Sequence, residues 1–177
     1  MKKVIVKISE GLGNQLFMYA NAYSFSKKIG YDLYIDSVSG YKKLKIRNFL
    51  LNNFKIDIKY ADKRDVNCNL INYLRLKLDK KIDIFRTNKK FLIEKRFENK
   101  STKYLDYTKF NFCDKIFLEG YFESELFFKD YKSDIKNLFQ LKNVNKKTLY
   151  LNPDQILKEN SVSIAIRTHR FSEKSSE

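Results

Sequence analysis

The sequence is poor in the residues that most often carry metal chemistry and disulfide bonds. Its 177 residues include two cysteines, Cys68 and Cys113, one histidine, His169, and no tryptophan. A multi-histidine zinc site or a Ser-His-Asp triad would have to be built around that single histidine. Two cysteines without metal-type spacing are more typical of small buried hydrophobes or inert thiols than of a disulfide. The composition therefore argues against zinc and classical hydrolase chemistry, and we expect no metal site.

Long apolar runs are also lacking. No stretch approaches the roughly 20 apolar residues that a helix needs to cross a bilayer. The basic start, Met1-Lys2-Lys3, leads into a short β-branched run rather than into the longer apolar core of a secretory signal. We therefore expect a cytoplasmic protein.

Positive charge is what the chain has in excess. Lysine and arginine total 36 against 21 aspartates and glutamates, which gives a formal net charge of +15. Such a charge suits nucleic acid, anionic lipid headgroups or a phosphorylated substrate. Lysine nevertheless dominates, as in AT-rich coding sequences, and no nucleic-acid-binding signature is present. We expect no nucleic-acid partner, and a non-catalytic basic module that binds anionic membrane or nucleic acid is the alternative function.

The first 30 residues form the most informative pattern. The β-branched run at residues 4–8 predicts a buried central strand. Residues 16–26 follow helical spacing, and the helix would end at Gly30. Gly11 and Gly13 lie between strand and helix, where they allow a sharp turn and bring bare backbone N–H groups near a ligand.

Asn14 and Gln15 would stand at the N-terminus of that helix, where the amides and the helix dipole favour an anionic oxygen. The loop is neither a P-loop, which needs Gly-Lys-Ser/Thr, nor a full dinucleotide fingerprint, which needs a small residue where this chain has Leu16. Asp36 ends a predicted strand about 20 residues further on, as the ribose-binding acid of a nicotinamide site would. A nicotinamide site and a tight turn that serves only packing remain as alternatives.

Residues 70–78 predict a helix with Leu70, Ile71, Leu74 and Leu78 on one face. A basic stretch flanks this helix and comprises Lys77, Lys80, Lys81, Arg86, Lys89 and Lys90. We interpret the segment as a surface for membrane or for an acidic partner. With Asp79 and Asp83 interspersed, an ordinary solvated helix face is the alternative.

Strands and helices alternate along the rest of the chain. Residues 91–93 and 115–118 predict strands, Gly120 breaks the second of these, and residues 125–141 predict a helix. That helix would carry an apolar stripe of Leu126, Phe127, Tyr131, Ile135, Leu138 and Phe139. The alternation predicts an α/β fold with a mainly parallel sheet.

A last buried strand is expected at residues 161–167, ending at Arg167. Ligands of open α/β sheets lie beyond the carboxyl ends of the strands, and a guanidinium fork there suits a diphosphate. Alternatively, Arg167 pairs with a surface carboxylate or caps the strand end.

Three segments together resemble glycosyltransferase family 11, the α-1,2-fucosyltransferases (galactoside 2-alpha-L-fucosyltransferases). EGLGNQLF at 10–17 is similar to that family's Gly-Gly-Leu-Gly-Asn-Gln opening, with Glu10 in place of the first glycine. FLEGYFESE at 117–125 is similar to its Tyr-Leu-x-Gly-Tyr-x-Gln-Ser-Glu element, with Glu123 where glutamine is usual. VSIAIRTHR at 162–170 aligns with the His-x-Arg-Arg-x-Asp motif, of which it keeps Arg167 and lacks the residues replaced by Ala165, Thr168 and Arg170.

The resemblance implies a GT-B-like fold of two Rossmann-like halves. Residues 1–150 would be the N-terminal, acceptor-side half, and residues 151–177 a linker helix and the first strand of a GDP-fucose-binding half. The chain would then be an N-terminal fragment, whose activity by itself is an open question.

The implied reaction is an inverting, metal-independent transfer of L-fucose from GDP-fucose to the 2-hydroxyl of a galactose-terminated glycan, in cell-surface glycan synthesis. Arg167 would be catalytic, holding the diphosphate as charge builds on it. The substrate-binding residues would be Asn14, Gln15, Gly11, Gly13, Gly120 and Tyr121. We expect no cofactor besides the donor substrate, and peripheral contact with the inner face of an anionic membrane.

Overall fold

The protein is described from a computed structural model that covers residues 1–42, 47–94, 104, 106–143, 156, 158, 160 and 162. The chain divides into two units, Met1–Lys142 and Asn143–Glu177. All the helices and strands given below belong to the first unit. The predicted strand at 161–167 and its Arg167 lie outside the described residues, apart from Val162.

A four-stranded parallel sheet is the centre of the first unit. Its strand order is β2-β1-β4-β3. The strands are β1 (Lys3–Lys7), β2 (Asp32–Asp36), β3 (Lys89–Ile93) and β4 (Phe112–Glu119). β1 pairs with both β2 and β4, so the prediction of a central strand is confirmed. The α/β class with a parallel sheet is confirmed as well.

Helix α1 (Leu12–Ile29) covers one face of the sheet. It begins directly after Gly11 and ends at Gly30, whose left-handed backbone lets its N–H reach the last carbonyls of the helix. Side chains alternate along a strand, so residues at every second position of β1 meet this helix. The resulting core includes Val4, Val6, Ile8, Met18, Ala22 and Phe25.

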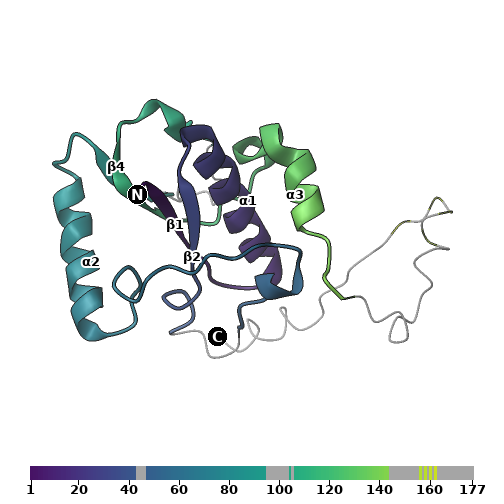
Figure 1. Cartoon of the computed structure of the whole chain (residues 1–177), viewed down its shortest axis with the longest axis horizontal. Helices are drawn as coiled ribbons and strands as arrows, with labels where there is room; N and C mark the ends of the chain where they lie inside the picture. The colour runs from purple at the N-terminus through teal and green to yellow at the C-terminus, as the bar shows by residue number, and fades with distance from the viewer. Residues whose placement is uncertain are drawn as a thin grey trace, which may run out of the picture. The chain divides into compact units, whose positions relative to one another are not determined.

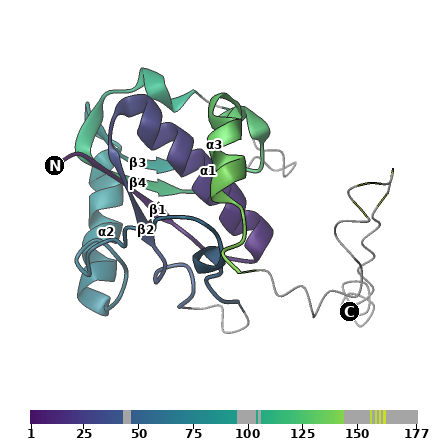
Figure 2. The ribbon, with the colours of Figure 1, turned by 45° about the vertical axis from the view of Figure 1, so that its right-hand side comes forward.

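Helix α2 (Leu70–Asp83) lies on the opposite face, as Figures 1 and 2 show from two directions. The helix begins at Asn69, whose side chain accepts a hydrogen bond from the backbone N–H of Asn72 at 2.8 Å. A second, smaller apolar cluster of Ile5, Phe91 and Phe117 lies on this face, with Leu76 of α2 packed against it. The two sheet faces thus carry cores of very different size.

The predicted continuous helix at 125–141 is wrong. The structure has two short 3₁₀ segments, Glu125–Phe127 and Lys129–Tyr131, followed by α3 (Lys132–Leu138). Phe127 packs into an aromatic cluster with Phe122 and Tyr107, at ring-centroid distances of 5.4 and 6.1 Å. This packing takes the first turn out of a helical path, and Leu126 of the predicted stripe is exposed.

The cysteines are both free thiols. Cys68 is exposed and Cys113 is half-buried, so neither is the fully buried hydrophobe that was one of the expectations. Within the described ranges, no helix is long and apolar enough to cross a membrane.

The order of the strands creates a switch point between β1 and β4. From β1 the chain passes through α1 to β2 at one edge, and then through α2 to β3 at the other edge. Connections on opposite faces leave the loops after β1 and β4 side by side at the carboxyl end of the sheet. In open α/β sheets this crevice is where ligands bind.

Candidate active site

The carboxyl ends of β1 and β4 bring together oppositely charged side chains. Lys7 ends β1 and Glu119 ends β4. One carboxylate oxygen of Glu119 lies 2.5 Å from the Nζ of Lys80 on α2, and the other lies 3.7 Å from the Nζ of Lys7. The ion pairs hold Glu119 at the carboxyl end of β4 and join α2 to the strand ends.

The two motif loops meet above these strand ends. The Tyr121 hydroxyl, in the loop after β4, donates a hydrogen bond of 3.3 Å to Oε1 of Glu10, in the loop after β1. The two residues are 111 positions apart in sequence. The segments at 10–17 and 117–125 therefore lie side by side at the carboxyl end of the sheet.

Glu94, which directly follows β3, anchors the loop after β4. Its carboxylate accepts hydrogen bonds from the backbone N–H groups of Tyr121 at 2.6 Å and Phe122 at 3.0 Å. A Cβ at Gly120 would overlap the Glu94 side chain, so this position needs glycine for close approach. Gly120 thus shapes the site through its backbone, which places the Tyr121 side chain.

Glu10 has an unusual backbone for a residue with a side chain. Its φ is 65°, in the left-handed region that favours glycine. The family resemblance places a glycine at this position. Glu10 thus has a glycine-type conformation while its side chain lines the crevice, and strain of this kind concentrates at functional sites.

The crevice is hollowed to a volume of about 830 Å³. Its lining includes Lys7, Ser9, Glu10, Lys42, Asn67 and Tyr121. Hydroxyl, amide and carboxylate groups together offer both donors and acceptors, which is the chemistry that binds the hydroxyls of a sugar. A hollow of this size is in the range of small-molecule sites.

The hydroxyl of Tyr41 is buried near Glu10. Burial raises the pKa of Tyr41 to about 12, and the nearby charge of Glu10 adds to the shift. The hydroxyl is therefore protonated at neutral pH. It is buried and has no hydrogen-bond partner in the described part of the chain.

The side-chain amide of Gln15 is buried and fully hydrogen-bonded within the protein. It has no exposed surface, and its Nε2 donates to the carbonyls of Glu10 at 2.9 Å and Asn48 at 2.8 Å. Its Oε1 accepts from the N–H of Leu50 at 2.9 Å. Gln15 therefore supports the site by tying its loop to residues 48–50, and it has no exposed amide for the predicted contact with substrate.

The other residues predicted in this loop lie at the start of α1. Gly11 precedes the helix, and Gly13 and Asn14 are in its first turn. Gly13 is exposed, while Gly11 and Asn14 are half-buried. Their contact with a substrate stays a prediction, as does the role of Arg167, which lies outside the described residues.

The carboxylate of Asp36 is hydrogen-bonded to the backbone of the turn that follows it. Its Oδ1 accepts hydrogen bonds from the backbone N–H groups of Val38 at 3.0 Å and Ser39 at 2.8 Å, and the residue is buried. The carboxylate closes the loop after β2, as an Asx turn does. This use of the carboxylate weakens the nicotinamide alternative, which needs Asp36 for a ribose.

Sequence reasoning missed Lys7, Lys80, Glu94 and Glu119 as residues of the site. The signal that could have found three of them is their position, because Lys7 and Glu119 end predicted strands and Glu94 follows one. Lys80 could not have been found in this way, since it pairs with Glu119 from α2, a helix that packs on one face of the sheet.

Comparison with known proteins gives one curated relative. The chain is 29% identical over 168 residues to an alpha-1,2-colitosyltransferase of Escherichia coli, and the match covers 94% of this chain and 54% of the relative. The chain thus spans about half the length of that glycosyltransferase. No protein-family model matches the chain, and no solved structure does.

Proposed function

We propose that the protein is a glycosyltransferase that transfers a deoxy sugar, L-fucose from GDP-fucose, to the 2-hydroxyl of a galactose-terminated glycan. The observation that carries this proposal is the similarity to the colitosyltransferase along 94% of the chain. Colitose and fucose are both deoxy sugars, and the α-1,2 linkage in the relative's name agrees with a 2-hydroxyl acceptor. Cell-surface glycan synthesis is the process that we propose for it.

The geometry supports a role of the described unit in holding the acceptor. Its crevice offers Glu10, Tyr121 and Asn67 as hydrogen-bonding groups for sugar hydroxyls. A neutral sugar needs such directional donors and acceptors, whereas a diphosphate needs concentrated positive charge. The two lysines that line the crevice, Lys7 and Lys42, are paired with Glu119 and Asn67. We therefore assign the acceptor to this crevice and the donor to a GT-B-like second half that begins within residues 151–177.

The proposed chemistry is an inverting displacement without a metal. The acceptor hydroxyl attacks the anomeric carbon and releases its proton to solvent, while the bond between that carbon and the β-phosphate oxygen breaks, so negative charge develops on the leaving GDP. A preorganised arginine stabilises that charge where it develops. We propose Arg167 for this role, on the strength of its place in the third motif.

A transfer assay tests the proposal. The protein with its complete second half is incubated with a galactose-terminated oligosaccharide and either GDP-fucose or a nucleotide-activated colitose, and the product is identified by mass spectrometry and linkage analysis. We expect a 1→2-linked product, and loss of about 10²-fold or more in turnover for Arg167→Ala. Arg170→Ala is the matched control, since Arg170 departs from the motif. Equal turnover for wild type and Arg167→Ala would refute the role of Arg167.

A variant of the crevice tests the acceptor assignment separately. Tyr121→Ala removes a side chain that lines the hollow, and we expect it to raise the KM for the acceptor by about tenfold while the KM for the donor is unchanged. Tyr60→Ala is the control, because Tyr60 is an exposed tyrosine whose hydroxyl bonds to Asn52. An equal effect of the two variants would contradict the assignment.

A further inference from the structure

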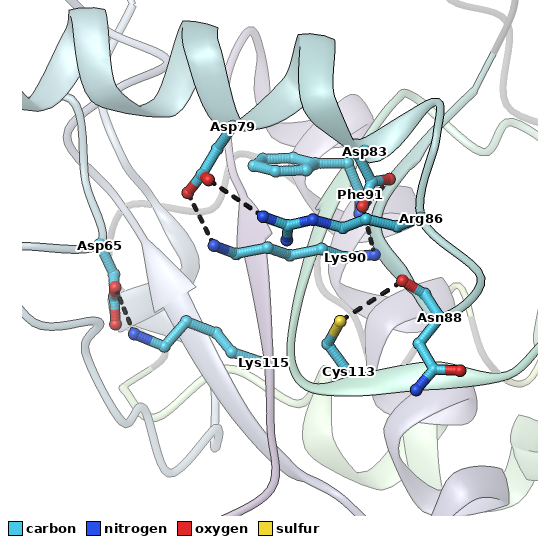
Figure 3. A network of polar contacts seen from close by, with 9 residues as sticks. All are labelled: Asp65, Asp79, Asp83, Arg86, Asn88, Lys90, Phe91, Cys113 and Lys115. Carbon is cyan, nitrogen blue, oxygen red and sulfur yellow. Dashed lines mark hydrogen bonds and ion pairs between the residues drawn. The ribbon is translucent and has the colours of Figure 1, made fainter.

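Helix α2 is attached to the sheet by its polar side. Asp83 is buried, and its two carboxylate oxygens accept hydrogen bonds from the backbone N–H groups of Lys90 at 2.8 Å and Phe91 at 3.1 Å. Asp79, one turn earlier, pairs with the side chains of Lys90 at 2.7 Å and Arg86 at 3.4 Å. Figure 3 shows both carboxylates pointing from the helix toward these partners.

The opposite side of the helix is apolar and uncovered. Five side chains spaced at one helical face are 49–76% exposed, namely Leu70, Ile71, Leu74, Leu78 and Ile82. Directly after the helix, Ile84 is 74% and Phe85 is 89% exposed. A contiguous apolar face of this kind on the surface of a protein marks an interaction site.

The exposed charged residues of α2 itself are all of one sign. Arg75, Lys77 and Lys81 are exposed along the outward side of the helix, whereas its two acidic residues, Asp79 and Asp83, are turned inward. The acidic residues that favoured an ordinary solvated face in the sequence are thus removed from it. The basic patch is also smaller than expected, because Lys80, Arg86 and Lys90 are paired with carboxylates.

We propose that α2, together with Ile84 and Phe85, is an interfacial helix that docks the protein on an anionic lipid surface. An apolar face flanked by Arg75, Lys77 and Lys81 fits a membrane whose headgroups are negatively charged, with the side chains immersed by roughly 5–10 Å. A second copy of the chain fits less well, since a two-fold contact would bring the positive rims together. The inference does not depend on the proposed glycosyl transfer.

Docking would also orient the crevice. Leu70 and Tyr73 of α2 line the same hollow as Glu10 and Tyr121. The N-terminal end of the docked helix therefore lies beside the crevice, which would open close to the lipid surface.

Vesicle co-sedimentation of the 177-residue chain tests the proposal. We expect binding to phosphatidylcholine vesicles that contain phosphatidylserine, little binding to phosphatidylcholine alone, and a steep loss of binding as salt is added. The double variant Lys77→Gln/Lys81→Gln should weaken binding by roughly tenfold or more, and Leu74→Asn/Leu78→Asn should abolish it. The control, Lys109→Gln/Lys136→Gln, makes the same charge change outside α2 and should bind as the wild type does.

Tryptophan fluorescence gives a second readout. The chain has no tryptophan, so Phe85→Trp introduces a single indole. We expect its emission to shift to shorter wavelength with anionic vesicles, while Phe110→Trp, also at an exposed position, should not shift. All these positions are exposed, and unchanged circular dichroism checks that each variant is folded.

Four results would overturn the proposal. They are no binding to anionic vesicles, binding that the α2 variants do not reduce, an indole at position 85 that is already shielded without vesicles, and a dimer in sedimentation that Leu74→Asn/Leu78→Asn disrupts. The last two would assign the face to another part of the protein or to a second copy.

Discussion

The two faces of the sheet hold their helices by different means. On one face, α1 packs its apolar side chains into the large core, with Met18, Ala22 and Phe25 buried. On the other, α2 contributes Leu76 to a small apolar cluster and is held by Asp79 and Asp83. A helix that packs by its apolar side has that side buried. A helix attached by carboxylates keeps its apolar side exposed, where it can contact another surface.

The two faces should also respond differently to salt and pH. Burial of apolar area is insensitive to moderate salt and to pH, while ion pairs are screened by salt and lost when a partner is neutralised. The α1 face should therefore set the overall stability of the unit, and the α2 face should set its response to conditions.

The largest expected effect is on the α1 face. Phe25 is buried, with its ring 5.4 Å from that of Phe112, and Phe25→Ala should lower the free energy of unfolding by about 3–5 kcal/mol. The matched change on the other face, Leu76→Ala, should cost about 1 kcal/mol because Leu76 is only half-buried. Urea denaturation measures both changes in the free energy of unfolding. Equal losses would contradict the difference between the two faces.

A smaller effect is expected from the carboxylate that holds α2. Asp83→Asn keeps the shape but replaces one of two acceptor oxygens with a donor, opposite two backbone N–H groups. We expect a loss of about 2 kcal/mol, since hydrogen bonds to charged groups are the stronger ones. Asp57→Asn, at an exposed position, should cost almost nothing. If the two variants were equally stable, α2 would not be held by this carboxylate.

The pH response should come from Asp65, on the same side of the sheet. Burial raises the pKa of its carboxyl, but the hydrogen bonds and charges of Lys115 and Lys3 outweigh burial and hold the pKa below its ordinary 3.8. A lowered folded pKa means that the stabilisation is complete above about pH 4 and is lost as the pH falls through the folded value. Asp65→Asn should cost about 1–2 kcal/mol at neutral pH.

The two unfolding curves test the sign of this effect. Stabilities of wild type and Asp65→Asn should converge as the pH falls below 3.8. A gap that stays constant down to acid pH would show that Asp65 is structural but does not titrate in this range.

The smallest expected effect is at the crevice, at the carboxyl end of the sheet. Glu10→Gly should raise the free energy of unfolding by up to about 1 kcal/mol, because glycine adopts the φ of 65° without strain. Glu10→Ala is the control, since it also removes the contact with Tyr121 but keeps a Cβ. Equal stability of the two variants would mean that the backbone of Glu10 is not strained.

Local patterns were enough to predict much of the fold. The β-branched run of β1, the end of β2 at Asp36 and the helix that stops at Gly30 depend on residues close together in sequence. The prediction of one helix at 125–141 failed because the local structure there depends on a residue distant in sequence: Phe127 packs on Tyr107.

The same distinction applies to the surfaces. The sequence pattern grouped the leucines of α2 correctly on one face. It could not show how the helix is attached to the sheet, because that depends on Asp83 binding the backbone of Lys90 and Phe91. Gln15 was predicted to contact a sugar. The sequence did not reveal that its amide is already bonded, because its partners, Asn48 and Leu50, lie 33 and 35 residues away. Arg167 and the GT-B arrangement stay predictions.

The central claim is that the loops after β1 and β4 form a sugar-binding site. Titration of a galactose-terminated oligosaccharide into the ¹⁵N-labelled chain, followed by amide chemical shifts, tests it most directly. We expect saturable shifts at Ser9, Glu10 and Tyr121, which Tyr121→Ala weakens by about tenfold, and no shifts along the exposed face of α2. Shifts confined to α2, or no saturable shifts at the loops at any concentration, would contradict it.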